Sequence, residues 1–166
     1  MGFAFGHLTN RVLRPLHDKS LEVTITIVLA LAAAVTVAGQ GFAVGAEPAS
    51  YTNTFLSKYK QWNRNVVRAV NNHDQATRVA QIRLTKRVVQ YTDRHLTWLE
   101  RTQPNKACAI RAEHRYYKAV LAFRNKLSRA HWALRQWRPN VALRAIKAAL
   151  PKQAAAYRAA KSVINC

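Results

Sequence analysis

The sequence predicts an all-α protein: an antiparallel four-helix bundle with a kinked fourth helix, preceded by an N-terminal hydrophobic signal or anchor helix. Three observations lead to this fold class. Apolar residues recur at intervals of three and four through much of residues 52–164, the period of an amphipathic helix. Glycine is absent after Gly45, and three late prolines separate the periodic segments. An uncharged, mostly apolar run lies before all of them, from Val23 to Ala46.

Residues 1–46 form the predicted leader, and residues 47–166 the domain that it exports. Basic residues precede the apolar run, an arrangement that keeps the N-terminus in the cytoplasm and carries the rest outward. The most apolar part, Val23 to Ala38, is about sixteen residues, whereas a membrane span needs about twenty. Val44 and Ala46 fit a signal peptidase that cuts after Ala46. A secreted protein is therefore expected, and an extracytoplasmic protein anchored by residues 23–46 remains the alternative.

The first two helices of the domain are predicted from their apolar positions. A helix from about Thr52 to Asn72 has a single stripe, and Asp74 is expected to cap the helix that follows. That second helix, from about Gln75 to Arg101, is apolar over a wider arc, which is typical of a helix packed between two neighbours. The stripe of the first helix comprises Phe55, Tyr59, Trp62, Val66 and Ala69. The arc of the second comprises Val79, Ala80, Ile82, Leu84, Val88, Val89, Tyr91, Leu96, Trp98 and Leu99.

The third and fourth helices follow the turn at Gln103-Pro104, where Pro104 suits a first helical turn. The third helix has the longest regular stripe, and Arg138-Pro139-Asn140 is expected to end it. The fourth runs from about Val141 to Ile164, and Pro151 is expected to kink it. The stripe of the third helix is Tyr116, Val120, Phe123, Leu127, Ala130, Leu134 and Trp137. That of the fourth is Leu143, Ile146, Leu150, Tyr157, Ala160 and Ile164.

The two cysteines of the chain, Cys108 and Cys166, are predicted to form a disulfide, because exported thiols oxidise. Helix lengths support the pairing. About 44 Å of helix separates Cys108 from Trp137, and about 38 Å separates Val141 from Cys166, so an antiparallel pair brings both sulfurs to one end. Closing so long a loop adds about 4 kcal/mol of stability in the chain-entropy model. A bridge between two copies of the chain is the alternative, and the oligomeric state stays open.

The exported domain is strongly basic, which points to a polyanionic partner. Residues 47–166 hold 24 of the 27 Lys and Arg but only 5 of the 7 Asp and Glu, a net charge of +19. Arginine outnumbers lysine 15 to 9, and arginine binds phosphate through two hydrogen bonds. We expect anionic lipid head groups or phosphate-bearing wall polymers as partners, with nucleic acid second. An ordinary solvated surface is the alternative to all of these.

The last two helices carry the predicted polyanion-binding residues. Basic residues alternate with apolar ones along the fourth helix, a pattern typical of helices that lie in a bilayer interface, so we expect membrane contact. Trp132 lies off the stripe of the third helix and is expected to be exposed. The predicted residues are Arg111, Arg115, Arg124, Arg129, Trp132, Arg135, Arg138, Arg144, Lys147, Lys152, Arg158 and Lys161.

Few side chains suited to catalysis or metal binding occur at a usable spacing, so neither an enzyme nor a metal or other cofactor is predicted. The exception is a set of side chains near the Gln103-Pro104 turn. A tight hairpin there would bring Asp93 level with Glu113 and place His95 near His114, as in an acid-base pair of a small cell-wall hydrolase. Neutralisation of neighbouring arginines is the expected role of these carboxylates.

The function predicted from sequence is therefore an exported, non-enzymatic cationic protein that binds anionic envelope surfaces, with membrane perturbation or antibacterial action as a consequence. The alternatives are an anchored envelope or lysis-associated structural protein that engages partner helices, and the hydrolase that would use Asp93 and Glu113.

Overall fold

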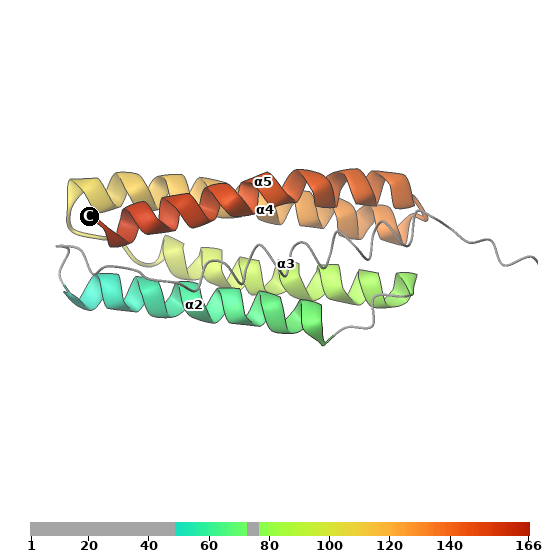
Figure 1. Ribbon diagram of the computed structural model, residues 1–166, viewed down its shortest axis with the longest axis horizontal. Helices are drawn as coiled ribbons and strands as arrows, with labels where there is room; N and C mark the ends of the chain where they lie inside the picture. Colours follow the sequence, from blue (N-terminus) through green and yellow to red (C-terminus); the bar gives the residue numbers. More distant parts are fainter. Residues whose placement is uncertain (1–48, 73–76) are drawn as a thin grey trace, which may run out of the picture.

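The computed structural model describes residues 49–72 and 77–166, and this part of the chain is all-helical, with four helices and no strand. Figure 1 shows the helices side by side, each running opposite to the one before it. The prediction of an all-α protein with four helices is confirmed for these residues. The predicted signal or anchor helix lies outside them. The helices are α2 (Ala49–Asn71), α3 (Arg78–Glu100), α4 (Ala107–Arg135) and α5 (Pro139–Ile164).

The core is built around aromatic side chains that α2 and α4 direct toward each other. The Phe55 ring meets the Tyr116 ring edge-on, with centroids 5.2 Å apart, and the Trp62 ring meets the Phe123 ring edge-on at 6.1 Å. Edge-to-face pairs of this kind add stability beyond the burial of area. The stripe predicted for α2 is buried along its whole length, from Phe55 to Ala69.

Helix α3 begins at Arg78 with Thr77 as its N-cap, whereas Asp74, the cap predicted from the sequence, lies outside the described residues. The backbone N–H of Ala80 donates to the Thr77 hydroxyl at 3.2 Å, which satisfies one of the free N–H groups of the first turn. The predicted apolar arc is only partly buried: Leu84 and Leu99 lie in the core, whereas Val79 is exposed. Polar residues take part of the buried face, namely Gln81, Thr85, Thr92 and His95.

Helix α4 buries its predicted stripe from Tyr116 to Leu134, but Trp137 departs from it. The helix ends at Arg135, and Trp137 has a φ of 56°, in the left-handed region. The N–H of Arg138 donates to the Ala133 carbonyl, and that of Trp137 to the Leu134 carbonyl, the two bonds of a Schellman motif. Glycine is preferred at this position, and any other residue costs about 1–2 kcal/mol there. The prediction that Trp137 is a core residue is therefore wrong.

Helices α4 and α5 make the most extensive contact among the described helices. Many of the buried side chains on these two helices are small, and small side chains allow helix backbones to approach closely. From α4 these are Ala109, Ala112, Ala130 and Ala133, and from α5 Ala142, Ala145, Ala149, Ala156 and Ala160, all of them buried.

Helix α5 starts with Pro139 at its first position, where the missing N–H costs nothing. The sequence predicted that Pro139 helps to end α4, and the structure shows that it also begins α5. The helix continues through Pro151, which is exposed on its outer side. The kink expected there stays a prediction. Pro104, expected in the first turn of α4, instead precedes that helix, whose N-cap is Lys106.

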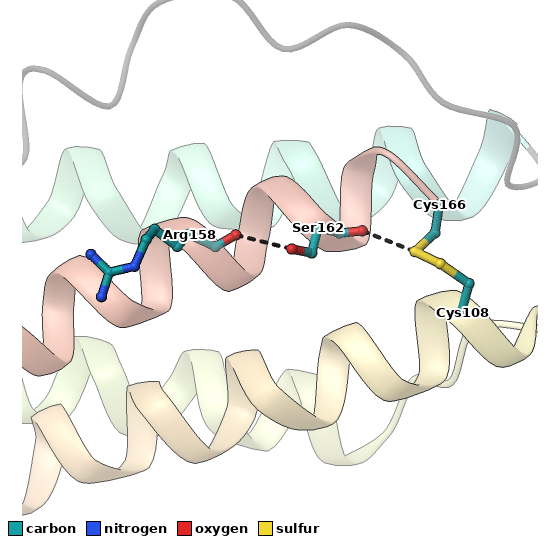
Figure 2. The surroundings of a disulfide bond; sticks show 4 residues. All are labelled: Cys108, Arg158, Ser162 and Cys166. Atoms are coloured by element: carbon teal, nitrogen blue, oxygen red, sulfur yellow. Dashed lines mark hydrogen bonds between the residues drawn. A yellow bond between two sulfur atoms is a disulfide. The ribbon is translucent and has the colours of Figure 1, made fainter.

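A disulfide joins the start of α4 to the end of α5, as the helix lengths predict. Cys108 lies in the first turn of α4 and Cys166 just after α5, with Cα atoms 5.7 Å apart (Figure 2). The Ser162 carbonyl oxygen also lies 3.0 Å from the Cys166 sulfur. This is a polar contact only, because a sulfur in a disulfide carries no hydrogen to donate. The bridge encloses both helices in one covalent loop.

Candidate functional site

The outer side of α4 carries a row of exposed residues, four of which are basic. Its exposed positions recur at intervals of three, four and seven residues, so they lie on one side of the helix. The row begins at Arg111 and ends at Trp132. Its members are Arg111, Arg115, Lys118, Asn125, Arg129 and Trp132.

A second basic row lies on the outer side of α5. Arg144, Lys147, Arg158 and Lys161 are exposed at helical spacing, with Lys152 beside them. Because α4 and α5 pack closely, the two rows belong to one helix pair. Residues 107–166 contain thirteen Lys and Arg, and eleven of them are exposed.

The acidic residues of this helix pair do not offset the two rows. Residues 107–166 contain a single acid, Glu113, whose side chain is only 8% exposed. It accepts a hydrogen bond from the Tyr51 hydroxyl of α2. Burial raises the pKa of the Glu113 carboxyl, and the hydrogen bond from Tyr51 opposes that rise. The exposed charge on α4 and α5 is therefore entirely positive.

Arg124 is the predicted site residue that the structure pairs with an acid. Its Nε donates to Asp93 Oδ1 at 2.7 Å and a terminal nitrogen to Oδ2 at 3.3 Å, a two-point ion pair. The hydrogen bond to Asp93 raises the pKa of the guanidinium. Arg124 is therefore held in an ion pair with Asp93 of α3, whereas the other predicted arginines and lysines are exposed. Asp93 therefore neutralises an arginine, but this arginine lies on α4 and not beside Asp93 in the sequence as predicted.

One end of the helices combines exposed tryptophans with arginines. We call this the Trp–Arg tip and define it by Arg78, Val79, Trp132, Arg135, Trp137 and Arg138. Trp132 is 50% exposed, as its position off the stripe predicted, and Trp137 is 75% exposed. The Arg138 guanidinium lies 5.4 Å from the centre of the Trp132 ring.

Arg78 connects α3 to this tip. Its Nε donates to the Leu134 carbonyl at 2.6 Å and a terminal nitrogen donates to the Arg135 carbonyl at 2.9 Å, so it satisfies two carbonyls at the end of α4. Its guanidinium carbon lies 3.6 Å above the centre of the Trp137 ring. Sequence reasoning missed both residues. For Trp137 the nearest signal was Pro139, two residues later, which disfavours helical backbone at Arg138 and so places Trp137 close to the end of the helix.

The acid-base arrangement considered as an alternative near Gln103-Pro104 does not form. Asp93 lies level with Arg124 and Glu100 with Tyr117, whose hydroxyl donates to it at 2.7 Å. The connection between α3 and α4 is long enough for α4 to extend past the end of α3 (Figure 1), by about 15 Å of helix from Ala107 to Tyr117. Glu113 lies in this extension, away from Asp93. The expectation of a tight hairpin was therefore wrong.

The two histidines of that arrangement are also separated by their surroundings. His114 is exposed, whereas His95 is buried between the rings of Trp62 and Trp98, with centroids at 5.2 and 5.8 Å. His95 Nε2 lies 2.7 Å from the Tyr116 hydroxyl. Desolvation lowers the pKa of His95 to about 3, and the nearby Lys58 charge adds to this. His95 is thus a neutral core residue.

A shallow groove of about 190 Å³ opens beside His95, between α2 and α3. Lys58, Gln61, Asn65 and Arg94 supply polar groups to it, and Trp98 supplies an aromatic wall. No acidic residue lines the groove, so it extends the positive character of the surface to this side of the molecule.

Neither a metal-ligand cluster nor a helix suited to span a membrane occurs among the described residues, 49–72 and 77–166. No cluster of three or more His, Cys, Asp or Glu side chains is arranged to hold a metal ion there. None of the helices α2 to α5 has the length and apolar character that a membrane-spanning helix requires.

Comparison of the chain with models of known protein families, with curated proteins and with solved structures found no match.

Proposed function

We propose that the protein is an exported, non-enzymatic cationic protein that binds anionic envelope surfaces, either lipid head groups or phosphate-bearing wall polymers. In this proposal the leader carries residues 47–166 out of the cytoplasm, and helices α2 to α5 act as one antiparallel four-helix bundle. The basic rows of α4 and α5 make the contact. Membrane perturbation follows where the anionic surface is a bilayer.

One observation carries the proposal: eleven exposed basic residues on the α4–α5 pair face solvent with no exposed acid among residues 107–166. Such a surface generates a positive potential that attracts and orients polyanions. Arginine adds paired hydrogen bonds to phosphate oxygens. The disulfide supports the same proposal, because it stabilises a domain that its own charge tends to disrupt.

The test is binding of the exported form to vesicles. We expect cosedimentation with vesicles of phosphatidylglycerol and phosphatidylcholine, weakening as salt is raised, and little binding to phosphatidylcholine alone. Neutral vesicles also report any contribution from an uncleaved leader, since that contribution does not require anionic lipid. Purified anionic wall polymer provides the second arm. A protein that binds none of these anionic surfaces would contradict the proposal.

A charge-matched pair of variants locates the surface. R144E/K147E/R158E reverses three exposed charges on α5, and K60E/R64E/R68E reverses three exposed charges on α2. Both replace two arginines and one lysine, so the net charge changes equally. We expect the α5 variant to lose more affinity than the α2 variant. Equal losses would show that total charge governs binding and that the α4–α5 pair has no special role.

A further inference from the structure

Three of the four large hydrophobic side chains that are exposed among the described residues belong to the Trp–Arg tip, and the fourth, Ile110, lies in the first turn of α4. Trp62 is only 5% exposed, whereas Trp132 and Trp137 are 50% and 75% exposed, and Val79 of the same tip is 53% exposed. Exposed large hydrophobic side chains that gather in one place mark interaction sites. The indole ring combines a large apolar face with a hydrogen-bond donor, which suits a boundary between water and apolar material.

The backbone at Trp137 makes this exposure a built feature of the fold. Trp137 occupies the left-handed position of a Schellman motif, where glycine would be preferred. Arg78 holds the same turn by its hydrogen bonds to Leu134 and Arg135 and covers one face of the indole ring. The structure therefore holds a bulky aromatic side chain outward at a site that is unfavourable for it. Strained positions of this kind occur at functional sites.

The positive charge of the tip indicates what kind of partner it can bind. Arg78 lies over Trp137, Arg138 lies over Trp132, and Arg135 is exposed in the last turn of α4. No acidic residue occurs in 77–79 or 132–142. A partner must therefore offer apolar material to the indoles and negative charge to the guanidinium groups. The boundary region of an anionic bilayer provides both, because tryptophan is enriched there and arginine binds the lipid phosphates.

We propose that the Trp–Arg tip docks end-on into the interface of an anionic lipid bilayer, with Trp132 and Trp137 at head-group depth. This inference rests on the proposed function and narrows it from polyanions in general to lipid. Single-stranded nucleic acid also combines phosphate with stacking surfaces. The tip suits it less, because Arg78 covers one face of Trp137 at 3.6 Å and so closes that face to a stacking base.

The experiment compares the exported wild-type protein with W137G and W132S, using vesicles that contain phosphatidylglycerol and lipids brominated in the acyl chains. We expect bromine to quench tryptophan fluorescence of the wild type, and the double variant W132S/W137G to lose this quenching and to bind at least about tenfold more weakly. W137G places glycine where the backbone favours it, so we expect its thermal midpoint to be unchanged or raised. Weaker binding by a variant of equal stability cannot result from misfolding.

The control variant is W98F, which alters an indole on α3 outside the tip, and it is expected to keep wild-type affinity and tip quenching. If W132S/W137G binds anionic vesicles as tightly as the wild type, the tip proposal is overturned while the proposed function stands. If neither protein binds any anionic surface, both fail. If the variants lose affinity for oligothymidylate but not for vesicles, the tip is a nucleic-acid site and the lipid proposal is overturned.

Discussion

His95 shows how a single buried side chain couples stability to pH. Its folded pKa of about 3 lies below the unfolded value of 6.5, because burial between Trp62 and Trp98 disfavours the imidazolium, as does Lys58. The unfolded state therefore binds a proton that the folded state rejects. The stability associated with the neutral ring is complete above about pH 6.5 and falls as the pH drops toward 3, by up to a few kcal/mol.

The first prediction is that the free energy of unfolding decreases from pH 7 to pH 4 more steeply in the wild type than in H95Q. Denaturant titrations at several pH values measure this. Glu113 acts in the opposite direction, because stability is gained as the pH falls through its raised folded pKa, and this gain is complete below the unfolded pKa of about 4.5. Glu113 is present in both the wild type and H95Q, so its contribution to the pH dependence cancels when the two are compared. Identical pH profiles would mean that His95 is not held neutral in the core.

The second prediction concerns two adjacent tyrosines with different surroundings. Tyr116 is fully buried and its hydroxyl is the partner of His95 Nε2, so Y116F leaves a buried nitrogen without a hydrogen bond and is expected to cost about 1–3 kcal/mol. Y117F removes a hydroxyl that bonds Glu100 at the surface, where water replaces it, and is expected to cost less than about 1 kcal/mol. Denaturant midpoints of the two variants decide the matter. Equal midpoints would contradict the role assigned to the Tyr116 hydroxyl.

At the scale of single residues, the sequence predicted exposure well where a helical stripe was regular. Phe55 and Phe123 lie on long stripes and are buried, and Trp132 lies off its stripe and is exposed. Trp137 fits the stripe by its spacing alone, but spacing has meaning only while the helix continues. The Schellman motif that ends α4 turns the chain before this residue. Periodicity cannot show where the last turn ends, and Pro139, two residues later, limits the helix without fixing its last residue.

At the scale of helices, the third prediction concerns the bridge between α4 and α5. Reduction, or C166S, is expected to lower the free energy of unfolding by about 4 kcal/mol, because a loop with a sequence separation of 58 becomes free in the unfolded state. Chemical denaturation with and without reductant measures the loss. The variant C108S/C166S should match C166S and should not respond to reductant. Unchanged stability would show that the packing of the buried alanines alone holds α4 to α5.

The elements also show which relations between helices the sequence did not predict. The cysteine pairing was predictable, because helix length in residues converts directly to length in Å. The offset of α3 against α4 was not, because it depends on the path of the connecting segment between Glu100 and Ala107. That offset separates Asp93 from Glu113 and joins Asp93 to Arg124. The hydrolase hypothesis depended on the hairpin and loses its geometric support.

At the scale of the whole molecule, the two ends of the helices differ, because one carries the Trp–Arg tip and the other the start of α2 (Figure 1). The first residue of α2, Ala49, lies at the end of the helices opposite the Trp–Arg tip, and Cys166 lies at the same end as Ala49 (Figure 1). A helix of 23 residues such as α2 is about 34 Å long. The predicted leader precedes α2 in the sequence, so the two fates proposed for it predict different behaviours for the tip.

The fourth prediction separates these fates. A protein anchored by an uncleaved leader holds its tip some tens of Å from its own bilayer, because α2 begins near the anchor and the tip is one helix length away. Full chain reconstituted in neutral vesicles should then cluster added anionic vesicles, and light scattering should increase. Protein cut after Ala46 has no anchor and should bind the anionic vesicles without joining them to neutral ones. W132S/W137G, reconstituted in the same way, should cluster them less. Clustering that is equal in the wild type and this variant would mean that the basic rows of α4 and α5, and not the tip, contact the second membrane.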